Sequence, residues 1–157
     1  VINRETHPAA IAITLAADPG KAFRKYVYDT AHVPVTGDGD LQEPAGRLAA
    51  RDGELNDTVP ANSMALYTTA YDDDPPALVQ GLEVKAVGKT EGLPSDAKRL
   101  TWKPNTESDL CYYRVYHNNV RVGSTVATEY VVAGPERWRS GPYTVVAVDT
   151  SGNAREF

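Results

Sequence analysis

Apolar and polar residues alternate with a period of two along most of this 157-residue chain. The alternation runs from Ile11 to Leu15, from Met64 to Thr68 and from Leu82 to Val87. It is typical of β-strands, because successive side chains of a strand point to opposite faces of the sheet. Helical spacing is found only between residues 16 and 26, where Pro19 and Gly20 interrupt it. The chain is therefore predicted to be all-β.

Turn-forming sequences separate the predicted strands at short intervals. They include Gly37–Asp40, Arg51–Gly53, Gly92–Pro94 and Thr150–Asn153, which are rich in the residues that turns favour. Short strands with this punctuation are typical of β-sandwiches. Because 157 residues with 41% hydrophobic content suffice for two small cores, we predict two β-sandwiches in tandem.

A boundary between the predicted domains lies at the acidic, proline-containing segment Asp72–Pro76. Its three carboxylates repel one another, and its two prolines cannot donate a hydrogen bond to a strand ladder. We expect the segment to be extended and exposed. The predicted domains are residues 1–74 and residues 75–157.

Charge and composition exclude several classes of partner. The net charge is −5, so the chain offers no basic surface to nucleic acid or to an anionic membrane. No segment approaches the roughly 20 apolar residues that a membrane helix needs. A single cysteine, Cys111, excludes an intramolecular disulfide, and the three histidines lack the spacing of metal ligands. We expect no metal site and no cofactor.

The last third of the chain carries the most specific pattern, in strands predicted around Trp102, from Tyr112 to His117 and from Tyr143 to Val148. Strand parity assigns to the buried face Trp102, Tyr113, Val115, Tyr130, Tyr143, Val145 and Ala147. It assigns to the other face Tyr112, Arg114, Tyr116, Thr144 and Val146. The order of these motifs resembles a fibronectin type III module, in which a tyrosine placed like Tyr143 begins the penultimate strand. The resemblance implies that residues 75–157 form an immunoglobulin-like sandwich.

One loop of this module is the main candidate for binding. Trp138 lies between Arg137 and Arg139, and an apolar ring flanked by guanidinium groups suits either a neighbouring domain or a sugar. Packing against another domain or molecule is favoured, with capping of the sandwich end and ligand stacking as alternatives. For sugar binding, Tyr112 and Tyr116 would have to join Trp138 in one aromatic platform.

The first seventy residues resemble a different module. The strand from Ile11 to Leu15, the segment Tyr26–Asp29 and the strand that begins at Ser63, after Pro60, carry this resemblance. They are similar to the β-sandwich that follows the catalytic barrel in family 39 and related glycoside hydrolases. The resemblance implies a secreted or cell-surface, multimodular parent protein. Its catalytic carboxylates would lie on a barrel that precedes Val1, so no catalytic residue is carried over.

The residues themselves also predict no independent catalysis. A glycosidase needs two carboxylates held about 5–10 Å apart, whereas the acidic residues from Asp38 to Asp57 are expected to lie in Gly-rich turns. The chain is predicted to be a non-catalytic ancillary fragment of a glycoside hydrolase that braces the catalytic barrel and spaces the modules. The alternatives are a carbohydrate-binding module for polysaccharide and a protein-interaction module that uses an open sheet edge.

Overall fold

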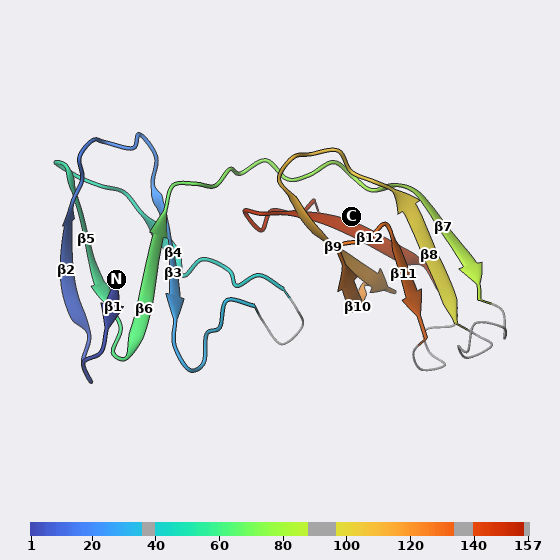
Figure 1. Cartoon of the computed structure of the whole chain (residues 1–157), viewed down its shortest axis with the longest axis horizontal. Coiled ribbons are helices and arrows are strands. Elements are labelled where there is room, and N and C mark those ends of the chain that lie inside the picture. The colour runs from blue at the N-terminus through green and yellow to red at the C-terminus, as the bar shows by residue number, and fades with distance from the viewer. Residues whose placement is uncertain (36–39, 88–96, 134–139, 156–157) are drawn as a thin grey trace. The chain divides into compact units, whose positions relative to one another are not determined.

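The computed structural model describes residues 1–35, 40–87, 97–133 and 140–155, which contain strands and no helix (Figure 1). The strands are β1 (Ile2–Asn3), β2 (Ala9–Thr14), β3 (Phe23–Tyr28), β4 (Gly46–Leu48), β5 (Glu54–Val59), β6 (Ser63–Thr68), β7 (Gln80–Ala86), β8 (Lys98–Lys103), β9 (Leu110–His117), β10 (Val120–Thr125), β11 (Glu129–Val132) and β12 (Tyr143–Asp149). The prediction of an all-β chain built of tandem sandwiches is confirmed. Within the described ranges there is no helix suited to spanning a membrane.

The chain divides into two compact units, Val1–Asp72 (unit 1) and Asp73–Phe157 (unit 2). Unit 1 holds a sheet with the strand order β1-β6-β3-β4 and a two-stranded sheet of β2 and β5. Unit 2 holds the sheets β10-β9-β12 and β11-β8-β7. Neighbouring strands pair antiparallel in all four sheets.

The interior of unit 1 lies between its two sheets. Leu55 and Val59 of β5 and Ala65 of β6 are at most 1% exposed. Ile11 and Ile13 of β2 stand opposite inward-facing residues of β5, and opposite residues of antiparallel strands share a face of the sheet. The alternation predicted for Ile11 to Leu15 therefore turns isoleucines inward and small residues outward.

The core of unit 2 matches the buried face that strand parity predicts. Its buried cluster comprises Leu100, Trp102, Tyr113, Val115, Val132, Val145 and Ala147, and Tyr130 and Tyr143 pack against it half-buried. The Trp102 and Tyr113 rings meet edge to face, with centroids 5.2 Å apart. Edge-to-face pairing of this kind adds to the gain from burial alone.

The other face of β9 and β12 is less open than strand parity predicts. Tyr112 is 8% exposed and Val146 is 7% exposed. The uninterrupted apolar run from Val145 to Val148 is typical of a strand buried on both sides, and the Arg114 guanidinium lies over the Tyr112 ring, 5.9 Å from its centroid. Tyr112 therefore lacks the exposure that a ligand-binding aromatic residue needs.

The segment that links the two units, residues 69–79, contains no strand. Tyr71, at the end of unit 1, is faced by the cations Lys21, Arg24 and Arg47, which lie 3.7, 4.2 and 5.2 Å from the ring centroid. Asp73 and Asp74 are exposed, in agreement with the prediction for the acidic segment, whereas Pro76 is buried. The exposed part of the segment is thus shorter than its composition suggests.

Candidate interaction surface

One side of the larger sheet of unit 1 exposes a continuous set of apolar side chains. Alternation along β6 buries Ser63 and Ala65, so that Met64 and Leu66 point outward and are 41% and 47% exposed. The strand register places Ile2 and Tyr28 on either side of Met64. It also places Tyr26 beside Leu66. The five outward residues, Ile2, Tyr26, Tyr28, Met64 and Leu66, are referred to below as the apolar face.

Two tyrosines form the aromatic part of the apolar face. Tyr26 and Tyr28 are two residues apart on β3, so their side chains leave the sheet on the same side. Their ring centroids are 6.4 Å apart and the ring planes differ by 9°. Burial, and secondarily the neighbouring Tyr26, raises the pKa of Tyr28. A tyrosine hydroxyl at its ordinary pKa of about 10 is already protonated near neutral pH, so that of Tyr28 is available as a hydrogen-bond donor.

A shallow hollow of about 320 Å³ adjoins the apolar face. It is lined by Ile2, Asn3, Arg4, Tyr28, Asn62, Ser63 and Met64. The exposed guanidinium of Arg4 is the one charged group in this lining. The surface thus combines apolar and aromatic side chains with polar groups at its margin, which is the general composition of protein interfaces.

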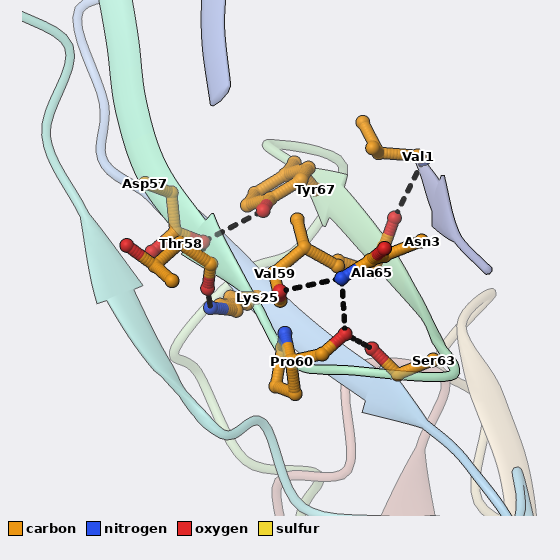
Figure 2. A network of polar contacts seen from close by, with 10 residues as sticks. All are labelled: Val1, Asn3, Lys25, Asp57, Thr58, Val59, Pro60, Ser63, Ala65 and Tyr67. Carbon is orange, nitrogen blue, oxygen red and sulfur yellow. Dashed lines mark hydrogen bonds and ion pairs between the residues drawn. The ribbon is translucent and has the colours of Figure 1, made fainter. Parts of the chain in front are cut away.

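A buried asparagine holds the edge strand β1, and with it Ile2, in position. The Asn3 Nδ2 lies 3.1 Å from the carbonyl oxygen of Val59 and 2.9 Å from that of Pro60, and Figure 2 shows it between these two groups. The Ser63 hydroxyl donates to the same Pro60 carbonyl at 2.7 Å. The two Asn3 side-chain bonds add to the backbone pairing with β6 that holds this two-residue strand.

A second polar group joins the two sheets beneath the apolar face. Lys25 of β3 lies 2.6 Å from the Asp57 carboxylate of β5, and both side chains are 13% exposed. The Tyr67 hydroxyl donates to the same carboxylate at 2.6 Å, as Figure 2 shows. Burial alone would raise the pKa of Asp57, but the hydrogen bonds from Lys25 and Tyr67 lower it below its usual value. The group is therefore an ion pair with a bound hydroxyl.

This polar group is unsuited to glycosidic acid catalysis. A general acid of that kind needs a carboxyl with a raised pKa so that it carries a proton near neutral pH, whereas the pKa of Asp57 is lowered. In unit 2, the Asp149 carboxylate accepts hydrogen bonds at 2.8 Å from the Ser151 and Asn153 amides and from the Asn153 side chain. Those bonds build the turn that the sequence predicts there, and they occupy both carboxylate oxygens.

Of the five binding residues proposed from the sequence, the structure describes Tyr112 and Tyr116. Trp138, Arg137 and Arg139 lie outside the described residues. Tyr116 is half-buried and stands between Arg121 and Thr144 in the sheet register. The apolar face was not predicted as a site. In the sequence, apolar residues occupy both the odd-numbered and the even-numbered positions of Ser63–Thr68, and Tyr26 and Tyr28 are two residues apart on β3.

Comparisons with known proteins show a likeness to solved structures alone. No family model matches the chain, and no curated protein matches it. Among solved structures, the chain is similar to the crystal structure of the Clostridium perfringens spore cortex lytic enzyme SleM, with 22% sequence identity and a TM-score of 0.41. The match covers 68% of this chain and 32% of that chain. A likeness at this level assigns no family.

Proposed function

We propose that this chain is a non-catalytic ancillary part of a glycoside hydrolase and that unit 1 docks on the catalytic module through the apolar face. The exposure of Ile2, Met64 and Leu66 on one side of a sheet carries the proposal. Contiguous apolar residues on a soluble protein commonly mark a surface that a partner covers. The resemblance of the first seventy residues to the barrel-attached sandwich of family 39 enzymes supports a catalytic barrel as that partner.

The proposal includes a fibronectin type III identity for unit 2, which would space the catalytic module from other modules or from the cell surface. Two three-stranded antiparallel sheets and a core built on Trp102 and Tyr113 support it. Tyr143 begins β12, which is the last strand of the described residues, whereas the resemblance implies a penultimate strand there. Modules of this type serve mainly in secreted and cell-surface proteins, so we place the parent protein there as well.

A carbohydrate-binding module is the second candidate, and one observation favours it. The nearly parallel rings of Tyr26 and Tyr28 give unit 1 an aromatic pair, and aromatic rings stack on the apolar faces of sugars. The aliphatic residues Ile2 and Leu66, however, are among the most exposed members of the same face. They add apolar area without the polar groups that a sugar site uses to fix its ligand, which favours a protein partner.

Leu66→Asp is expected to weaken binding of the full chain to the separately produced catalytic module of its parent enzyme by about tenfold or more. The reason is that docking would bury the new carboxylate in an apolar contact without a partner. Because the Leu66 side chain is 47% exposed in the free chain, the variant should remain folded. Isothermal titration calorimetry measures the affinity, and circular dichroism verifies the fold.

Thr14→Asp is the matched control, because Thr14 is an exposed strand residue of the other sheet of unit 1. It should bind like the unchanged chain. Equal affinities for the unchanged chain and Leu66→Asp would contradict docking through the apolar face. Electrophoresis through gels that contain xylan, cellulose derivatives or arabinan tests the second candidate. Retardation that Tyr28→Ala or Trp138→Ala abolishes would favour a carbohydrate-binding module instead.

A further inference from the structure

The strand β5 carries a short motif that the proposed docking function does not use. Asn56-Asp57-Thr58 has the form Asn-x-Thr, which is the acceptor sequence for N-linked glycans when the middle residue is not proline. Asn56 and Thr58 are both exposed, whereas Asp57 between them points to the interior and pairs with Lys25. The two residues that the modification requires therefore share the outer side of the β2–β5 sheet.

The surroundings of Asn56 leave room for a large substituent. Ala12 stands directly opposite Asn56 on β2, and Ala10 stands opposite Thr58; both alanines are exposed. A hollow of about 340 Å³ adjoins the asparagine and is lined by Arg47, Leu48, Ala49, Arg51, Glu54 and Asn56. Within the described part of the chain, neither the Asn56 nor the Thr58 side chain has a hydrogen-bond partner. Attachment would therefore disrupt no side-chain contact described for them.

We propose that Asn56 is an acceptor for N-linked glycosylation when the chain is exported through a compartment that holds an oligosaccharyltransferase. The donor is an oligosaccharide linked to a polyprenyl diphosphate. The Asn56 Nδ2 forms a bond to the anomeric carbon of the first sugar, and the bond from that carbon to the diphosphate oxygen breaks. The lipid diphosphate leaves with the electron pair, and the transferase accepts one proton from the amide.

The position of the motif predicts when this reaction occurs. Asn56 lies in the middle of a paired strand, opposite Ala12, so its backbone is held in the sheet once unit 1 has folded. Access to a transferase is greatest before that pairing forms. We therefore expect Asn56 to be modified during export and the folded chain to be a poor acceptor. The glycan would cover the outer side of the β2–β5 sheet and leave the apolar face, on the other sheet, open.

The test is secretion of the full chain from a eukaryotic host, followed by intact-mass and peptide mass spectrometry. The unchanged chain should carry a glycan on the peptide that contains Asn56, and a glycan-releasing amidase should remove it. N56Q and T58A should remove the modification, whereas T58S should retain it because serine also supplies the required hydroxyl. Thermal unfolding of N56Q verifies that the variant folds, as its exposed position predicts.

Translation of the same four chains in a cell-free system with microsomes gives a second measurement that does not depend on secretion. A mobility shift for the unchanged chain and T58S, absent in N56Q and T58A, supports the proposal. An unchanged chain that enters the microsomes and remains unmodified overturns it, as does a glycan that persists in N56Q. The outcome is independent of docking, because none of these substitutions touches the apolar face.

Discussion

Trp102→Ala is expected to destabilise unit 2 by about 3–5 kcal/mol. The indole is 6% exposed and contacts Tyr113 edge to face within the buried cluster between the two sheets. Truncation removes this apolar burial and leaves a cavity, which the surrounding strands fill only in part. Urea unfolding, followed by amide hydrogen exchange in β8 and β9, measures the loss in unit 2 separately from unit 1.

Lys103→Ala is the control for this experiment, because Lys103 is the exposed residue next to Trp102 on the same strand. Its effect should stay within about 0.5 kcal/mol, as for ordinary surface substitutions. A loss below about 1 kcal/mol for Trp102→Ala would contradict a core organised around this side chain.

Asp57→Ala is expected to destabilise unit 1 by about 2–3 kcal/mol. The substitution leaves the Lys25 ammonium and the Tyr67 hydroxyl without their shared carboxylate between the sheets. The loss of stability should be smaller than for a fully buried pair, because the Lys25 and Asp57 side chains are each 13% exposed to solvent. Glu54→Ala, an exposed position on the same strand, should change the stability little.

The same carboxylate makes the stability of unit 1 depend on pH. Its pKa is lower in the folded chain than its usual value, so the folded state favours the ionised form. The resulting stabilisation is fully present above the unfolded pKa of about 4 and is lost as the pH falls through the lower folded pKa. Above pH 5, Asp57→Asn should be less stable than the unchanged chain. As the pH falls into the acid range, the stability of the variant should decline less than that of the unchanged chain. An unchanged acid profile would show that another group is responsible.

The sequence predicts the core of unit 2 well for a physical reason. In β12 the alternate residues Val145 and Ala147 lie opposite Val115 and Tyr113 of β9, so the inward parity of the two strands agrees. Trp102 and Tyr113 are both buried in the cluster between the two sheets. Once one such residue is placed inward, the period of two fixes the others on that strand.

The parity of β6 cannot be deduced from hydrophobicity alone. Met64 and Leu66 are more hydrophobic than Ser63 and Tyr67, yet they point outward. The inward set is fixed by partners distant in sequence, because the Tyr67 hydroxyl bonds the Asp57 carboxylate of the opposite sheet. Local pattern reading does not detect such a contact. The apolar face, which is the candidate site, is therefore the part of unit 1 that the sequence predicts least well.

The strand β10 of unit 2 is not among the strands predicted above, although its turn leaves a signal in the sequence. Asn118 and Asn119, between β9 and β10, have φ values of 49° and 62°. A two-residue hairpin turn of type I′ needs positive φ at both positions, and asparagine tolerates that conformation better than most residues. The pair therefore predicts a hairpin after His117, and β10 does pair with β9 from Val120, with a register shift between Arg121 and Gly123.

The bracing role requires that binding through the apolar face stabilise the catalytic module. A module that binds only the folded catalytic module stabilises it in proportion to the logarithm of its own concentration over the dissociation constant. At a hundredfold excess over the dissociation constant this amounts to about 2.7 kcal/mol. The apolar area that Ile2, Met64 and Leu66 expose to water in the free chain would then be buried against the catalytic module.

The melting temperature of the parent's catalytic module, measured alone and with increasing amounts of this chain, tests that account most directly. The account predicts that the melting temperature rises with the concentration of the chain and that the rise is absent with Leu66→Asp but retained with Thr14→Asp. A melting temperature that stays the same at saturating amounts of the unchanged chain would contradict the bracing role.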